Sequence, residues 1–176
     1  MPSQPSQPHS LREGHEIVYG GGRVGLMGLL ADSALNTGGA VIGVMPRHLV
    51  DREIAHATLT RLEVVDDMHQ RKARMMALAD AFVALPGGAG TLEEIFEAWT
   101  WGQLGLHAKP CALYNIDGFY TPLLEQLDGM NTAGYLGEQH RSALGACSTP
   151  EALLGFLATY EHPASKWTDS AHPSAR

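Results

Sequence analysis

The sequence predicts an α/β fold built around a mainly parallel sheet, and three observations support this prediction. Short apolar runs alternate with segments of helical periodicity along most of the chain. Glycine-rich turns at residues 20–25 and 86–90 follow two of the apolar runs, where a parallel strand would pass into a helix. A hydrophobic fraction of 44% in 176 residues suffices for one core. We therefore expect one domain at 15–161, between polar, disordered tails at 1–14 and 162–176.

The expected elements follow from periodicity and from residues that start or stop helices. Gly38 and Gly39 end the first helix, an aspartate at 66 or 67 caps the second, and Ser148 opens a capping box before the last. A charged loop covers residues 51–58. In chain order, the predicted strands are 16–19, 40–45, 59–65, 81–85, 110–114 and 143–147, and the predicted helices are 25–35, 68–78, 91–103, 119–130 and 150–160.

The turn Pro86-Gly87-Gly88-Ala89-Gly90-Thr91 is suited to a phosphate. Glycine permits positive φ and close backbone approach, so the N–H groups at the start of the next helix can point at an anion. Thr91 adds a hydroxyl at this helix start. A nucleoside-triphosphate P-loop would carry Gly-Lys-Ser/Thr here, and the lack of that lysine argues against ATP hydrolysis.

Glu94 is the charged residue that this turn singles out. Helical side chains tilt toward the helix N-terminus, so Glu94 leans back toward the phosphate turn, whereas Glu93 points elsewhere. The alternative is that a carboxylate in the first turn merely favours the helix dipole.

Arg71 is singled out because it shares a helix stripe with three apolar residues, Met68, Met75 and Leu78. It either snorkels to the surface or reaches a ligand at the edge of the sheet where the strands end. Lys72 and Arg74 are expected to face solvent.

The first glycine turn does not predict an NAD site. Gly20, Gly22 and Gly25 satisfy the dinucleotide fingerprint, but the next strand ends in Pro46-Arg47-His48 instead of the required acidic residue. A monophosphate site shared by the two glycine turns is therefore favoured.

Composition restricts the partners. The net charge of −7, with no basic block, argues against nucleic acid and anionic membranes, and no run approaches a membrane span or a signal peptide, so we expect a cytoplasmic protein. Cys111 and Cys147 show no metal or redox spacing and are expected to be buried, without a disulfide. The scattered histidines also lack ligand spacing, which predicts no metal site.

Four motifs together resemble those of the Lonely Guy type cytokinin riboside 5′-monophosphate phosphoribohydrolases, often labelled "lysine decarboxylase". They span about residues 16 to 160 and are Tyr19-Gly-Gly-Gly-Arg-Val-Gly-Leu-Met-Gly28, Met68-His-Gln-Arg-Lys72, Pro86-Gly-Gly-Ala-Gly-Thr-Leu-Glu-Glu94 and Trp99-Thr-Trp-Gly-Gln-Leu-Gly105. The resemblance implies a Rossmann-like, doubly wound homodimer that cleaves purine nucleoside monophosphates into free base and ribose 5-phosphate, without metal or organic cofactor.

The resemblance also implies roles for individual residues. Arg71 and Glu94 fall on the family's catalytic pair: the carboxylate would stabilise positive charge on the ribose or orient a water, and the guanidinium would bind phosphate or ribose. The substrate-binding set implied beside them is Gly21, Gly22, Met68, Lys72, Pro86, Gly87, Gly88, Ala89, Gly90 and Thr91.

The chain departs from the family at its start. Members begin with one further strand and helix, whose loop carries Gly-Ser-Ser, and residues 1–14 resemble neither. That strand is central in the family's sheet, so its lack would expose sheet edges. A buried strand removes about 300 Å² of apolar surface from water, or roughly 7 kcal/mol, so we expect this chain to be poorly soluble or weakly active.

The sequence also allows two other functions and suggests an assembly state. The alternative to hydrolysis is a module that binds a nucleotide or cofactor without catalysis. A decarboxylase would need a pyridoxal phosphate lysine, and Lys72, Lys109 and Lys166 lie in no recognisable setting. The tryptophans Trp99 and Trp101 point to different helix faces; Trp101 therefore covers either a partner subunit, as in a homodimer, or a local loop.

Overall fold

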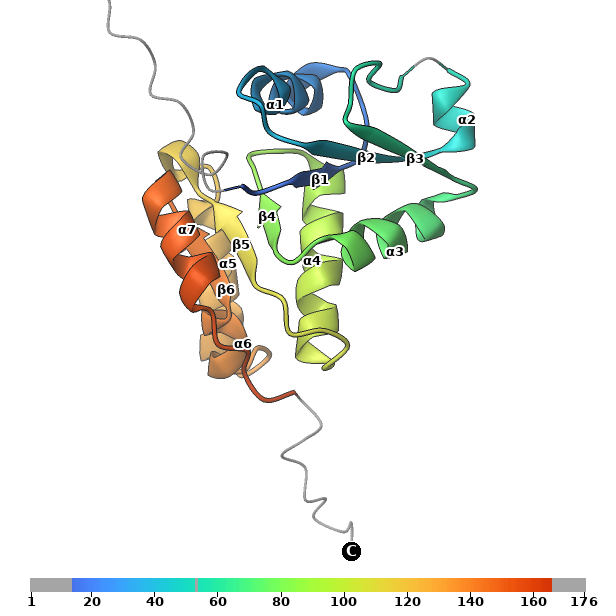
Figure 1. Ribbon diagram of the computed structural model, residues 1–176. Helices are drawn as coiled ribbons and strands as arrows, with labels where there is room; N and C mark the ends of the chain where they lie inside the picture. Colours follow the sequence, from blue (N-terminus) through green and yellow to red (C-terminus); the bar gives the residue numbers. More distant parts are fainter. Residues whose placement is uncertain (1–13, 53, 166–176) are drawn as a thin grey trace, which may run out of the picture. The chain divides into compact units, whose positions relative to one another are not determined.

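The computed structural model describes residues 14–52 and 54–165, and the chain divides into two compact units, Met1–Ala79 and Asp80–Arg176 (Figure 1). Each unit contains one three-stranded sheet in which all strand pairs are parallel. The predicted α/β fold with parallel strands is confirmed, although the strands form two sheets instead of one. The single domain predicted at 15–161 stays a prediction, and the predicted tails fall almost wholly outside the described residues.

The first unit is a parallel sheet between two helices. Its elements are β1 (Ile17–Tyr19), α1 (Gly25–Asn36), β2 (Val41–Pro46), α2 (Arg47–Val50), β3 (Arg61–Val65) and α3 (Met68–Leu78). The strand order is β1-β2-β3, and Figure 1 shows α1 on one face of this sheet and α3 on the other. Every residue of β2 is buried, which explains why that strand reads as a continuous apolar run instead of an alternating one.

Helix α1 packs on the sheet through small residues. Its buried positions are Gly28, Ala31 and Ala34, and the two alanines join Tyr19 and Val41 in a core cluster. The large apolar side chains on and before this helix point outward and are exposed: Val24, Leu26, Met27 and Leu29. The helix therefore lies close to the sheet and leaves its bulkiest residues uncovered by the described part of the chain.

The second unit repeats the plan with β5 as the central strand. Its elements are β4 (Phe82–Ala84), α4 (Ala89–Gln103), β5 (Cys111–Tyr114), the 3₁₀ turn η2 (Ile116–Gly118), α5 (Thr121–Thr132), α6 (Glu138–Ser142), β6 (Leu144–Cys147) and α7 (Pro150–Thr159). The strand order is β4-β5-β6. Helix α7 packs closely on β6 because a Cβ at Gly145 would lie within 2.6 Å of the Phe156 ring.

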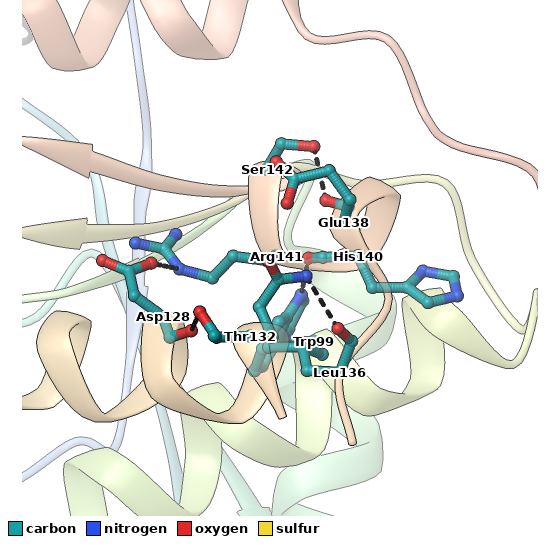
Figure 2. A network of polar contacts seen from close by, with 9 residues as sticks. Trp99, Asp128, Thr132, Leu136, Glu138, His140, Arg141 and Ser142 are labelled. Atoms are coloured by element: carbon teal, nitrogen blue, oxygen red, sulfur yellow. Dashed lines mark hydrogen bonds and ion pairs between the residues drawn. The ribbon is translucent and has the colours of Figure 1, made fainter. Parts of the chain in front are cut away.

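Polar contacts tie α4 to the α5–α6 segment (Figure 2). The indole N–H of Trp99, which is buried as predicted, donates to the carbonyl oxygen of His140 over 3.1 Å. Arg141 donates to Asp128 over 2.7 Å, and Asn131 donates to the carbonyl of Leu136 over 2.8 Å. The Trp99 bond holds the carboxyl-terminal half of α4, the helix that follows the second glycine turn, and the other two bonds lie within the α5–α6 segment.

Most predicted boundaries agree with the structure within a few residues, but two short helices and one capping residue differ from the prediction. Helices α2 and α6 were not predicted, because four or five residues are too short to show a helical period. Asp67 caps α3 as expected, by accepting from the N–H of Gln70 over 2.8 Å. The cap of α7 is Thr149, which accepts from the N–H of Ala152, so Ser148 was the wrong capping residue.

Both cysteines are buried and unpaired with each other, as predicted. Burial raises the pKa of the Cys111 thiol to about 12, which keeps it protonated and unreactive. In the described residues, no helix is both long and apolar enough to cross a membrane.

Candidate functional site

The first glycine turn leaves the carboxyl end of β1 and is held from inside the first unit. Gly21 and Gly25 adopt positive φ values of 78° and 63°, which only glycine reaches without strain. The buried hydroxyl of Tyr19 donates to the carbonyl of Gly22 over 3.1 Å. Gly21 and Gly22 are both buried, so this turn forms part of the packed structure and its shape is fixed.

Residues 54–56 clamp the same turn from the other side. The N–H of Arg23 donates to Ile54 over 3.0 Å, the N–H of His56 donates to Gly21 over 2.9 Å, and Gly22 bridges Ala55 in antiparallel fashion. The loop predicted at 51–58 is thus partly a short pairing partner for the glycine turn.

His56 connects residues 54–56 to α1 by a hydrogen bond. Its Nδ1 accepts from the N–H of Thr58 at 3.4 Å, so Nε2 carries the proton and donates to Asp32 over 3.1 Å. The imidazole is 9% exposed. Sequence reasoning missed this pair because the two residues lie on different elements, and no periodicity links them.

Arg71 reaches the end of the sheet from α3. Its Nε donates to the carbonyl of Val44 on β2 over 3.2 Å, and its Nη1 lies 3.9 Å from the sulfur of Met68. The guanidinium also lies against Gly20: a Cβ built there would overlap Nη2 and lie 3.0 Å from Cζ. Arg71 is half-buried, and its head group contacts the backbone where β1 ends. The side chain of Arg71 therefore reaches this edge of the sheet, and its role toward a ligand stays a prediction.

The neighbours of Arg71 differ in exposure. Met68 is 41% exposed, Lys72 is half-buried and His69 is exposed. Arg74 is exposed, as expected, and forms a two-pronged ion pair with Glu63 of β3, with Nη2 3.0 Å from Oε1. This bond, more than the nearby charges, holds the pKa of Glu63 below its ordinary value.

The second glycine turn leaves the carboxyl end of β4 and is held within the second unit. The buried hydroxyl of Tyr120 donates to the carbonyl of Leu85 over 2.6 Å, directly before Pro86. A Cβ at Gly87 would overlap the Thr91 hydroxyl and lie 2.9 Å from its Cβ. Gly87 is therefore needed for packing against Thr91.

Helix α4 begins at Ala89, two residues before the predicted start. The N–H groups of Thr91 and Leu92 both donate to the carbonyl of Gly88, at 3.1 and 3.2 Å. The N–H groups of Ala89 and Gly90 come before these first helical bonds, which is the position from which helices bind anions.

The glycines of the second turn do not adopt positive φ values. Gly87, Gly88 and Gly90 all lie outside the positive-φ region, so that part of the sequence argument was wrong. A Cβ at Gly88 or Gly90 would meet no atom within 4 Å. Neither backbone strain nor packing in the described residues explains these two glycines.

Glu94 lies in the second turn of α4, since the helix starts earlier than predicted, and so it was wrong to place it in the first turn. Its side chain is half-buried, whereas Glu93 is exposed. Glu94 belongs to the second unit, with Pro86 to Thr91, and Arg71 belongs to the first, with Gly21 and Gly22. Each half of the predicted site is thus assembled within its own unit.

Comparisons with solved structures support the fold. The X-ray structure of the structural genomics target TM1055 aligns with a TM-score of 0.61 and 24% identity, covering 86% of this chain and 82% of that one. The molybdenum cofactor binding protein of Rippkaea orientalis aligns with a TM-score of 0.63 and 22% identity, covering 86% of this chain and 81% of that one. At these identities the likeness concerns the fold alone.

Comparisons of sequence identify the family. Residues 27–157 match the family model described as "Possible lysine decarboxylase". The cytokinin riboside 5′-monophosphate phosphoribohydrolase of Rhodococcoides fascians is 51% identical over 142 residues, covering 80% of this chain and 72% of the relative. The Arabidopsis thaliana enzyme LOG7 is 46% identical, covering 83% and 67%.

A rice protein of the same group, the probable cytokinin riboside 5′-monophosphate phosphoribohydrolase LOGL2 of Oryza sativa subsp. japonica, is 48% identical over 82% of this chain. The chain spans 59% of the length of that relative. By its family-model match and by its identity to these relatives, the chain belongs to the cytokinin riboside 5′-monophosphate phosphoribohydrolase family.

Proposed function

We propose that this protein hydrolyses the N-glycosidic bond of purine nucleoside 5′-monophosphates, including cytokinin nucleotides, and releases the free base and ribose 5-phosphate. The observation that carries the proposal is the 51% identity with the Rhodococcoides fascians phosphoribohydrolase. The two glycine turns and the half-buried Arg71 and Glu94 supply the phosphate-binding and charge-stabilising groups that such a reaction needs.

Each unit carries groups of its own that are suited to a phosphate or ribose. At the start of α4, the N–H groups of Ala89 and Gly90 and the positive end of the helix dipole favour an anion. Gly88 and Gly90 lack any packing reason for being glycine, which supports close approach of a substrate to that backbone. Arg71 would add a charge-assisted bond to a phosphate or ribose oxygen. Pro86, Gly87, Thr91, Gly21, Gly22, Met68 and Lys72 complete the proposed substrate-binding set.

The chemistry assigned to Glu94 follows from the bond that breaks. When C1′–N cleaves, its electron pair stays on the base nitrogen, which then takes a proton, and positive charge develops on the ribose. A carboxylate near C1′ stabilises that charge and orients a water; the water oxygen bonds to C1′, and the proton that it loses balances the one that the base nitrogen takes. Glu94 is half-buried, and partial desolvation strengthens such a charge interaction.

Release of base from nucleotide tests the proposal. The protein is incubated with AMP and, separately, with isopentenyladenosine monophosphate, and free base is measured by chromatography. We expect release from at least one of them, with the Rhodococcoides fascians relative as positive control. No release from either, while the control is active, would contradict the proposal.

The alternative is a module that binds a nucleotide or cofactor and does not turn it over. A solved structural neighbour is named as a molybdenum cofactor binding protein, but at 22% identity that likeness extends only to the fold. This alternative predicts that AMP is bound and recovered intact. The decarboxylase reading predicts instead a cofactor absorbance band in the purified protein; of its candidate lysines, Lys166 lies outside the described residues.

We further propose that the enzyme acts as a cytoplasmic homodimer that needs no organic cofactor. Exposed apolar side chains on α1 support an association surface, because contiguous apolar patches usually mark contacts. Trp101 on α4 is half-buried, so the exposed part of its side chain is available for contact with a partner subunit as well. Sedimentation at micromolar concentration should give a dimer, and a monomer would count against this assembly.

A further inference from the structure

We propose that Gly20 is a positioning residue, because the space of its absent side chain is the space that the Arg71 guanidinium occupies. A Cβ at position 20 would overlap Nη2 of Arg71 and lie 3.0 Å from Cζ and 3.5 Å from Nε. All three nearest atoms belong to this one side chain. The effect of Gly20 on catalysis rests on the proposed function, whereas its steric relationship with Arg71 does not.

Backbone conformation gives no other reason for glycine at this position. Gly20 lies outside the positive-φ region, whereas Gly21, one residue later, has a φ of 78°. Any L-residue could therefore adopt the backbone of Gly20, but not that of Gly21. The dinucleotide fingerprint does not explain Gly20 either, because its acidic partner is lacking. In the part of the chain that the structure describes, the Arg71 head group is what requires a glycine here.

The guanidinium is held at a defined level of the sheet. Tyr19, the last residue of β1, pairs with Gly43 of β2, and Gly20 and Val44 are the residues that follow this pair in the chain. Arg71 contacts both: it lies against Gly20, and its Nε donates to Val44, which is fully buried. A planar guanidinium with one N–H fixed and one flank against a backbone has little freedom to rotate, so the directions of its other donors are set.

This arrangement predicts what a methyl group at position 20 would do. The guanidinium must move away from residue 20, because the end of a long side chain moves more easily than a backbone that is hydrogen-bonded in the sheet. Misplacing a substrate-binding group by about 1 Å can cost about 10²-fold in rate. Gly20→Ala should therefore resemble a loss of Arg71 while leaving Arg71 in the sequence.

A double-mutant cycle between Gly20→Ala and Arg71→Ala tests the inference. In the presence of Arg71, we expect G20A to lower the melting temperature and to lower kcat/KM by about 10-fold to 10²-fold. In the R71A background the methyl group meets no guanidinium, so G20A should lower neither quantity further. If G20A fails to fold, recovery of folding in G20A/R71A supports the inference, and failure of both overturns it.

Gly43→Ala is the matched control. A Cβ at Gly43 would clash in the same unit, 2.5 Å from Leu59 Cδ1 and 2.8 Å from the Gly21 Cα, and none of the three atoms nearest to it belongs to Arg71. Its effect on the melting temperature should therefore be the same with and without Arg71. Equal effects of G20A in both backgrounds would overturn the steric claim, whatever the activity.

The activity measurements separate this inference from the proposed function. If the wild-type protein releases no base, the proposed function fails, and the melting temperatures still decide whether Gly20 makes room for Arg71. If the wild type is active and G20A keeps its kcat/KM, the hydrolase proposal stands and the positioning role is wrong.

Discussion

The hydroxyl of Tyr120 donates a 2.6 Å hydrogen bond to the carbonyl of Leu85, the last residue before the second glycine turn. Tyr120 directly precedes α5 and is 2% exposed, and its own N–H donates to the side chain of Asn115 over 2.6 Å. Tyr120, in the connection before α5, thus holds Leu85, the residue that directly precedes the second glycine turn.

Tyr120→Phe should lower both stability and substrate binding. The change keeps the ring but leaves the Leu85 carbonyl without this donor, which costs about 1 kcal/mol of unfolding free energy. Denaturant melts measure the stability, and KM for AMP measures the binding. Tyr135→Phe is the control, since Tyr135 is 87% exposed and should change neither. An unaltered melt for Y120F would show that the bond is not needed.

Glu94→Gln should lower kcat by about 10²-fold or more while leaving affinity for the phosphate nearly unchanged. The amide keeps the shape of the side chain but removes the charge that stabilises the ribose in the transition state. Glu93→Gln, on the adjacent exposed residue, serves as the control and should retain activity. Equal activity of the two variants would exclude Glu94 as the catalytic carboxylate.

Alanine substitutions at two glycines of the second turn should affect stability and activity differently. Gly87→Ala clashes with Thr91 and should destabilise the protein. Gly90→Ala meets no atom within 4 Å and lies inside α4, so it should stabilise by about 0.5–1 kcal/mol through helix propensity, yet weaken AMP binding. Melting curves and KM for both variants test this; a G90A protein that is more stable and binds AMP normally would remove the ligand explanation for Gly90.

His56→Gln should loosen the first glycine turn. It weakens the contact with Asp32 that ties residues 54–56 to α1, and we expect a loss of about 1 kcal/mol and a higher KM. His48→Gln changes an exposed histidine and provides the comparison. If both variants melt and bind alike, the clamp does not depend on His56.

His107 should make stability fall in mild acid. Burial, together with Lys109 and His162, lowers its pKa in the folded state, against an opposing hydrogen bond to Ala98. As the pH falls through the unfolded value near 6.5, the unfolded chain takes up the proton first, so stability is complete above about pH 6.5 and declines toward the lower folded pKa.

His107→Gln removes this titration. Between pH 7.5 and 5, the melting temperature of H107Q should fall less steeply with falling pH than that of the wild type. Identical pH profiles would mean that other groups carry the acid sensitivity.

Local sequence patterns were enough to predict the order of strands and helices, since each is decided by spacing within about ten residues. They also singled out Arg71, because an arginine on an apolar stripe needs a reason to face inward. The partner that explains it, Gly20, lies some fifty residues away and carries no side chain, so no pattern could link the two. The same holds for His56 with Asp32 and for Tyr120 with Leu85.

The division into two sheets was also beyond the reach of periodicity. Strand alternation predicts parallel pairing but not which strands lie at a sheet edge, and among the described strands β1, β3, β4 and β6 each pair on one side only. The early start of α4 was missed because glycine has low helix propensity, although Gly90 is helical once the helix is held on its sheet.

The complete burial of β2 has a consequence for amide hydrogen exchange. β2 pairs with β1 at Val41 to Gly43 and with β3 at Ile42 to Pro46, and both neighbours shield its buried backbone from solvent. We therefore expect the amides of Ile42 and Gly43, which have a paired strand on both sides, to exchange only when the first unit opens. Their exchange rates would report the opening free energy of the unit that holds Arg71.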